Sequence, residues 1–282
     1  MRRITLFVLV IFTVSKNANS QAVKYDVFAV KFTSMGQATA TSVWASGAPA
    51  NDSVHIDFSV WLIKGSNGRN ILLDAGFLPD IEDARDFGIV NYTRPDSMLL
   101  KLGVKAGDIS DIIISHPHWD HIDGLGLFPN AKVWMQKDDY TYFVVGAWQK
   151  DGNHGGFHPR DVRLFTDLNL AGRLMLVDGD NKEIIPGIKV FTGSRHTFNS
   201  QYVLVETGSN NIILASDNIW VYYSLDHLVP ASPGGTLDNA GYVKAMQRMK
   251  SMVSDVKFII PGHDAEVFTK FRQVIPGVAA IK

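Results

Sequence analysis

The chain has 282 residues, of which 46% are hydrophobic, so it can bury a substantial core in one large domain or in two pseudo-repeated halves. Its 27 Lys and Arg residues nearly balance its 28 Asp and Glu residues and form no long basic run, which argues against a nucleic-acid partner. The absence of cysteine excludes disulfides and thiolate metal ligands, so zinc would have to be bound through nitrogen and oxygen.

The N-terminus has the pattern of a secretory signal peptide over residues 1–20. Arg2 and Arg3 precede the apolar run Ile4 to Val14, and Ala18-Asn19-Ser20 places small residues before Gln21. A membrane anchor or a buried first strand is the alternative, but the run is too short to cross a hydrocarbon core of about 30 Å. No later stretch is long and apolar enough to span, so we expect residues 21–282 to form a single periplasmic or secreted domain.

Apolar and alternating runs predict β structure early in the chain. Tyr25 to Phe32 alternates as a strand does, and Val54 to Lys64 followed by Asn70 to Asp74 predicts a hairpin around Gly65-Ser66-Asn67-Gly68. A helix is predicted at Pro95 to Leu102, with proline near its first turn.

The later sequence predicts a second group of strands that repeats the plan of the first. After the strand Asp111 to Ile114, the predicted elements are a strand at Lys132 to Met135, a helix at Asp138 to Trp148, strands at Leu174 to Val177, Ile188 to Thr192, Tyr202 to Glu206 and Ile212 to Ala215, a helix at Leu237 to Val253 and a strand at Lys257 to Ile260. Two mixed βα halves of this kind indicate an α/β fold with two mixed sheets face to face and helices outside.

The segment Ser115 to His121 carries four metal-binding side chains directly after a predicted buried strand, where open α/β sheets place their chemistry. His116 and His118 lie two positions apart, and Pro117 disfavours helix there, so both imidazoles can face one ion. Asp120 and His121 are adjacent and point differently, which suits a second ion nearby. A solvated polar loop is the alternative, and the choice depends on matching ligands elsewhere.

Three more polar residues follow apolar runs in the same way. His196 comes after Val190 to Gly193, Asp217 after Ile212 to Ala215, and His263 after Phe258 to Gly262. Alone, each would be interpreted as a strand-end cap or a satisfied hydrogen-bonding group. Together with the cluster at Ser115 to His121 they complete two coordination shells.

This set of residues, together with Asp74 in Leu72-Leu73-Asp74-Ala75-Gly76, resembles the metallo-β-lactamase superfamily over nearly the whole chain after residue 20. The resemblance implies an αββα sandwich with two zinc ions at the sheet edges. It implies that one zinc is held by His116, His118 and His196, that the other is held by Asp120, His121 and His263, and that Asp217 bridges them. Asp74 would lie behind the ligands and orient the histidine loop.

Within that superfamily, the sequence is most similar to N-acyl homoserine lactone lactonases, through its compact size, Ser34-Met35-Gly36-Gln37 and Arg195-His196-Thr197. Class B β-lactamases lack the bridging aspartate, and glyoxalase II adds a helical C-terminal domain. One position departs from the lactonase pattern: a tyrosine that contacts the substrate is usual three residues after the bridging aspartate, where this chain has Trp220. Tyr222 and Tyr223 are candidates to replace it.

The implied chemistry is hydrolysis by a hydroxide that bridges two zinc ions. Asp120 or Asp217 would transfer the proton to the leaving oxygen. The substrate is expected to be a small ester or lactone, a homodimer is one possible assembly, and candidate pocket residues, each with plain core packing as the alternative, are Met35, Phe77, Leu78, Trp119, Phe157 and Trp220. Another ester, thioester or β-lactam hydrolase, or a non-catalytic binding module, are the competing functions. His55, His154, His158 and His227 are left out of the metal set.

Overall fold

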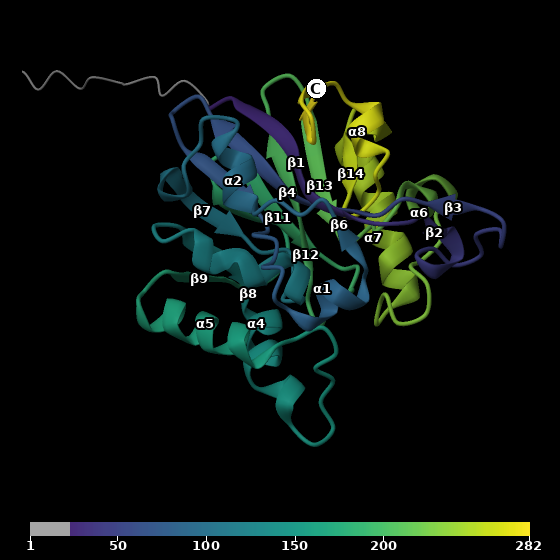
Figure 1. Cartoon of the computed structure of the whole chain (residues 1–282), viewed down its shortest axis with the longest axis horizontal. Helices are drawn as coiled ribbons and strands as arrows, with labels where there is room; N and C mark the ends of the chain where they lie inside the picture. The colour runs from purple at the N-terminus through teal and green to yellow at the C-terminus, as the bar shows by residue number, and fades with distance from the viewer. Residues whose placement is uncertain (1–22) are drawn as a thin grey trace, which may run out of the picture.

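The computed structural model describes residues 23–282, which form two β-sheets packed against each other with helices on the outer faces (Figure 1). This is the predicted α/β sandwich. The proposed signal peptide, residues 1–20, lies outside the described residues. Within residues 23–282, none of the helices combines the length and apolar character needed to cross a membrane.

The first sheet has nine strands and contains both ends of the described chain. Its order is β15-β16-β1-β4-β5-β7-β8-β9, with β6 paired to β1, and the run from β5 to β9 is parallel. The strands are β1 (Tyr25–Met35), β4 (Asp57–Gly65), β5 (Asn70–Leu73), β6 (Ile89–Val90), β7 (Ile109–Ile113), β8 (Lys132–Gln136), β9 (Leu174–Val177), β15 (Gln273–Ile275) and β16 (Val278–Ile281).

The second sheet has five strands in the order β10-β11-β12-β13-β14. They are β10 (Lys182–Ile185), β11 (Ile188–Thr192), β12 (Gln201–Glu206), β13 (Asn211–Ser216) and β14 (Ile259–Pro261). Only the β13–β14 pair in this sheet is parallel. A separate two-stranded ribbon, β2 (Thr39–Ala40) with β3 (Ser53–Val54), lies beside helix α6 in Figure 1.

The two sheets do not correspond to two consecutive halves of the chain, which corrects the predicted repeat. Leu174–Val177 was grouped with the second set of strands, but β9 pairs in parallel with β8 and ends the first sheet. The chain also returns at its end to the first sheet, where β16 pairs with β1. Strand identity was therefore predictable from local pattern, whereas sheet membership depends on long-range pairing.

Eight α-helices surround the sheets in the described chain. They are α1 (Glu82–Asp86), α2 (Pro95–Leu100), α3 (Trp119–Ile122), α4 (Lys137–Val144), α5 (Pro159–Leu170), α6 (Tyr222–His227), α7 (Asn239–Met252) and α8 (Val267–Lys270). The helix predicted for Asp138 to Trp148 ends early, and its last residues form a 3-10 turn at Gly146–Trp148. Helix α5 was not predicted, although Pro159 marks its first turn.

The central strands are apolar on both faces, which explains why their sequences are apolar runs without alternation. Along β4, Trp61 and Ile63 belong to the core between the sheets, whereas Val60 and Leu62 face the outer cluster. The same buried cluster includes Ile213 of β13 and the apolar side of helix α7, which packs on the second sheet. Helices α2, α4 and α5 cover the outer face of the first sheet through the cluster that contains Leu99, Phe143 and Phe165.

Replacing Ile213 with alanine should destabilise the fold by about 2–5 kcal/mol, because it removes a fully buried side chain and leaves a cavity. Urea denaturation followed by circular dichroism measures the change. Leu176→Ala on β9, where the side chain is 44% exposed, is the matched control and should cost no more than about 0.5 kcal/mol. Equal losses for the two variants would contradict the assignment of the core.

Candidate metal centre

The predicted ligands lie beyond the carboxyl ends of four strands from the two sheets. His116 and His118 follow β7, and Asp120 and His121 lie in the short helix α3 that comes next. From the second sheet, the ligands after β11, β13 and β14 are His196, Asp217 and His263. Because these strands run in the same direction within each sheet, their carboxyl ends lie at one edge of the sandwich. Residues distant in sequence therefore meet there.

The structure brings these side chains into two groups of candidate ligands. In each group the potential ligand atoms all lie within 4.8 Å of one another. One group is His116, His118, His196 and Asp217, and the other is Asp120, His121 and His263. The division is the one that the resemblance implied.

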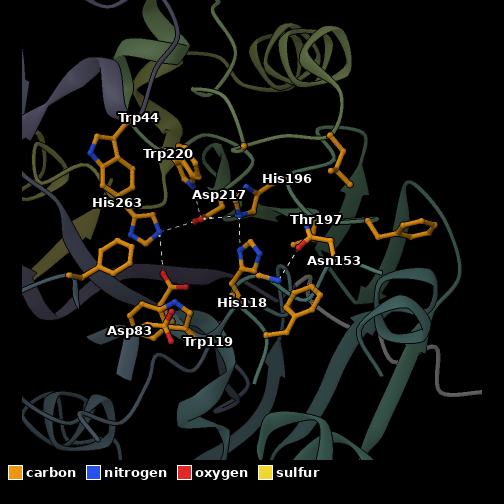
Figure 2. Close-up of a pocket in the computed structure, with 18 of the residues that line it drawn as sticks. Trp44, Asp83, His118, Trp119, Asn153, His196, Thr197, Asp217, Trp220 and His263 are labelled. Carbon is orange, nitrogen blue, oxygen red and sulfur yellow. Dashed lines mark hydrogen bonds and ion pairs between the residues drawn. The ribbon is translucent and has the colours of Figure 1, made fainter. Parts of the chain in front are cut away.

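Asp217 lies between the two groups, as Figure 2 shows. Its Oδ2 is 3.3 Å from His196 Nε2 and 3.8 Å from His116 Nε2. Its Oδ1 is 2.9 Å from His263 Nε2 and 3.3 Å from His121 Nε2. The carboxylate therefore has one oxygen toward each group, which is the geometry of a bridging ligand.

The site's own polar atoms fit a divalent metal. His116 Nε2 is buried without a hydrogen-bond partner, which is costly unless another group satisfies it, and His121 Nε2 faces only carboxylate oxygens, at 3.1 and 3.3 Å. His118 Nδ1 and His196 Nε2 approach each other to 2.9 Å. Imidazole and carboxylate donors of this kind suit zinc.

The first group is held in the protonation state that metal binding requires. Burial holds the pKa of His116 well below its ordinary value, lowers that of His118 to about 3, and lowers that of His196. Neutral imidazoles keep a free lone pair for a metal.

In the second group, negative charge outweighs burial. Burial again disfavours charge on His121 and His263, but the carboxylates of Asp120 and Asp217 raise the pKa of both imidazoles. The surroundings of this group therefore attract positive charge. A divalent cation bound there would supply that charge.

Asp74 supports both groups from behind. Its buried carboxylate accepts hydrogen bonds from the Ser115 N–H at 2.8 Å and from the Ser115 and Ser216 hydroxyls at 2.9 Å, and its Oδ2 is 2.8 Å from His121 Nδ1. The Ser115 hydroxyl is also 2.9 Å from His116 Nδ1. These contacts favour a proton on Nδ1 of His116 and of His121, because those nitrogen atoms face Ser115 and Asp74. The Nε2 atoms of the two imidazoles are then directed at the site.

Strained backbone accompanies the ligands. Asp74, Arg195 and Ser216 have φ values of 60°, 51° and 47°, in the left-handed region that non-glycine residues rarely adopt. Arg195 precedes His196 and Ser216 precedes Asp217. Strain of this kind costs about 1–3 kcal/mol per residue and persists where surrounding contacts determine the conformation, as they do here.

A cavity of about 450 Å³ opens over the ligands and is largely aromatic. Of the predicted pocket residues, Trp119, Phe157 and Trp220 line it, and Figure 2 shows Trp119 and Trp220 beside the ligands. Met35, Phe77 and Leu78 are absent from its lining in this structure. Phe77 is fully buried and packs behind Trp119, with ring centroids 4.7 Å apart.

Most residues of the cavity wall were not among those predicted from the sequence. The additional lining residues include Trp44, Phe58, Asp83, Phe87, Tyr142, Asn153, Thr197, Phe198 and Leu237. Phe58 lies on β4 far from any motif, yet its ring is 5.3 Å from that of His263. Nothing in the local sequence distinguishes such an aromatic residue from an ordinary core residue.

The two candidate tyrosines are not in the cavity lining either. Tyr222 is only 6% exposed, packs in the core and has the Lys270 ammonium 4.6 Å from its ring. Tyr223 stacks on His227 at 4.1 Å. Of Trp220, Tyr222 and Tyr223, it is Trp220 that lines the cavity in this structure.

The histidines left out of the metal set have other contacts. His158 Nε2 is 2.6 Å from Asp83 Oδ2, and His154 stacks on Trp148 at 4.9 Å. His55 and His227 belong to neither ligand group.

The sequence matches the metallo-beta-lactamase superfamily over residues 59–263, a range that contains every candidate ligand. The chain belongs to that superfamily. The predicted fold and family are thereby confirmed, and the protein is a metal-dependent hydrolase.

Curated relatives of this metallo-β-lactamase protein are N-acyl homoserine lactonases. One from a Bacillus species is 26% identical over 75% of this chain and 83% of its own length. AttM of Azorhizobium caulinodans is 26% identical over 62% of this chain, and the match spans 65% of AttM.

Solved structures give the same picture of the fold. AiiA of B. thuringiensis, bound to N-decanoyl-L-homoserine, superposes with a TM-score of 0.66 at 21% identity, covering 91% of this chain and 99% of AiiA. The dizinc quorum-quenching lactonase AidC superposes with a TM-score of 0.62 at 19% identity, covering 93% of this chain and 95% of AidC.

Asp74→Asn should weaken metal binding by about 10- to 100-fold, because an amide cannot accept all four contacts of the carboxylate. Asparagine tolerates positive φ, so the backbone can be kept. Competition with a chelator of known affinity measures the change. Asp111→Asn, at a buried aspartate in the middle of β7 that is not among the contacts of the ligands, is the control. Unchanged metal affinity in Asp74→Asn would contradict the supporting role of Asp74.

Proposed function

We propose that this metal-dependent hydrolase binds two zinc ions and opens the lactone ring of N-acyl homoserine lactones. The observation that carries the proposal is the pair of ligand groups joined by Asp217 at the end of a largely aromatic cavity. The lactonases among its relatives and structural neighbours support the choice of substrate.

In this proposal, His116, His118 and His196 hold one zinc, Asp120, His121 and His263 hold the other, and Asp217 contacts both. When bound, the two ions supply Lewis acidity for the ester carbonyl and lower the pKa of water toward neutrality. All seven side chains come from strand ends and short connections of a rigid sandwich, so their positions are fixed before substrate arrives.

Proton transfer is assigned to Asp120 rather than to Asp217. Each oxygen of Asp217 is already shared between two imidazoles. Asp120 lines the cavity, and its side chain is 11% exposed. It can therefore take the proton from the attacking water and return it to the ring oxygen that leaves, which stays tethered to the product.

The cavity suits an acyl chain because aromatic rings flank both ligand groups. Phe157 lies 5.5 Å from the ring of His118, and Phe58 lies 5.3 Å from that of His263. Beyond them, Tyr142 and Phe198 stack at 4.8 Å on the lining of the same cavity. A lactone head at the ligands would leave its chain against these rings.

Incubating the purified protein with N-decanoyl homoserine lactone should release acid in a pH-stat. The chelator-treated protein should lose this activity and regain it with zinc. Asp120→Asn should lower kcat by about 100-fold or more. Hydrolysis that is absent from the zinc-loaded protein, or that survives complete removal of metal, would rule out the proposal.

A second candidate is another ester, thioester or β-lactam hydrolase of the same superfamily, and the observation that favours it is Trp220 in place of the usual tyrosine. Parallel assays with nitrocefin and a glutathione thioester separate these substrates. A kcat/KM for either that exceeds the value for the lactone would move the assignment to that class.

We also propose that residues 1–20 are a signal peptide and that the protein works in the periplasm or outside the cell. The support is the basic start, apolar run and small residues before Gln21. Expression of the full chain in a secreting bacterium should give a periplasmic or extracellular product whose N-terminus, by intact-mass and peptide mass spectrometry, is Gln21. Uncleaved protein confined to the cytoplasm would refute this.

A further inference from the structure

Trp220 contacts the carboxylate that joins the two ligand groups. Its indole Nε1–H donates a hydrogen bond of 2.7 Å to Asp217 Oδ2 (Figure 2). An indole can donate but not accept, so the direction of this bond is fixed. It ends on the oxygen that faces His196 and His116, while Oδ1 faces the other group.

The position of the Trp220 ring is itself tightly determined. The backbone N–H of Trp220 donates to the Tyr242 hydroxyl at 3.2 Å, and its carbonyl accepts from the His263 N–H at 3.0 Å. The ring lies edge to face with Trp44 at 5.4 Å and with His196 at 5.3 Å. A donor held this firmly restrains the plane of the carboxylate that accepts from it.

Gly235 makes room for this arrangement. A Cβ atom added at Gly235 would lie 2.4 Å from Cη2 of Trp220 and 2.5 Å from Cζ3, closer than real Cβ contacts occur. The carbonyl of the same residue is 2.7 Å from His196 Nδ1 and so accepts a hydrogen bond from its N–H. One residue thus supports the orientation of Trp220 and of His196 at once.

We propose that Trp220 is a positioning residue that holds Asp217 between the two metal ions, and that Gly235 keeps Trp220 in place. The inference rests on the proposed two-metal site. It gives Trp220 a role different from substrate contact, because its single N–H is already used by Asp217. Without that bond, the carboxylate is free to rotate toward one ion at the expense of the other.

The test measures metal binding directly. In Trp220→Phe, which keeps an aromatic ring and removes the donor, the apparent Kd of the more weakly bound zinc should rise about 10-fold. The absorption spectrum of the cobalt-substituted protein should change as well, because the ligand geometry changes. Wild-type affinity together with a wild-type cobalt spectrum would overturn the proposal.

Trp134→Phe is the matched control, since the Trp134 indole also donates to a buried carboxylate, that of Asp111, at 2.9 Å. This variant loses the same kind of bond away from the site and should keep both zinc affinities. An equal loss of zinc affinity in Trp134→Phe would show that the effect is general destabilisation and would refute the positioning role.

Gly235→Ala gives a second, independent variant and should weaken zinc binding in the same direction. Gly126→Ala is its control, because a Cβ there would meet no atom within 4 Å. Thermal melting of the metal-free proteins verifies that each variant folds. Unchanged zinc affinity in Gly235→Ala would refute the part of the proposal that concerns Gly235.

The outcomes separate this proposal from the proposed function. A wild-type protein that binds two zinc ions without hydrolysing the lactone refutes the substrate but leaves the positioning role to be decided by Trp220→Phe. A wild-type protein that binds fewer than two ions refutes both.

Discussion

The burial of imidazoles and carboxylates at one edge of the sandwich is the constraint on which the rest of the structure depends. Such groups are costly to bury without partners. Asp74, the serine hydroxyls beside it and the backbone carbonyls of Asp57 and Gly235 bond the outer side of the cluster. On the inner side, His116 Nε2 has no partner and His121 Nε2 faces only carboxylate oxygens. A divalent cation satisfies these atoms, so metal binding and the stability of the folded site are coupled.

The burial of both faces of the central strands explains why the fold tolerates the cost of burying these polar groups. Central strands that are apolar on both sides bury one face against the other sheet and one against helices, which fixes the strand ends rigidly. The left-handed backbone of Asp74, Arg195 and Ser216 is the local consequence, because these turns must direct side chains inward within very few residues. The free energy gained by packing the core therefore offsets the cost of the strained backbone and of the buried polar groups at the site.

The candidate ligands could be proposed from sequence because each lies in a short polar segment that follows an apolar run, and the structure keeps these segments at strand ends. The sequence could not predict three features: that β9 belongs to the first sheet, that β16 pairs with β1, and that Phe58 lines the cavity. Each depends on which segments meet in space. The local sequence of a β-branched run or of a single aromatic residue does not indicate which strand it pairs with or which side chains it contacts. The positions of the Tyr222 and Tyr223 side chains likewise depend on helix α6, which their sequence distance from Asp217 does not reveal.

The replacement of a tyrosine by Trp220 has a consequence for selectivity. The indole N–H groups of Trp44 and Trp220 donate to Thr39 and Asp217, and the Thr197 hydroxyl donates to Asp139, so these donors on or beside the cavity lining are committed to the protein. Recognition by apolar contact discriminates by only about 1–3 kcal/mol per methylene, far less than a dedicated hydrogen bond to substrate does. Under the proposed function, the ions then orient the ester and the aromatic wall accepts chains of several lengths. Under that proposal, the geometry of the metal ligands determines the reaction, and the apolar cavity makes the choice of acyl chain permissive.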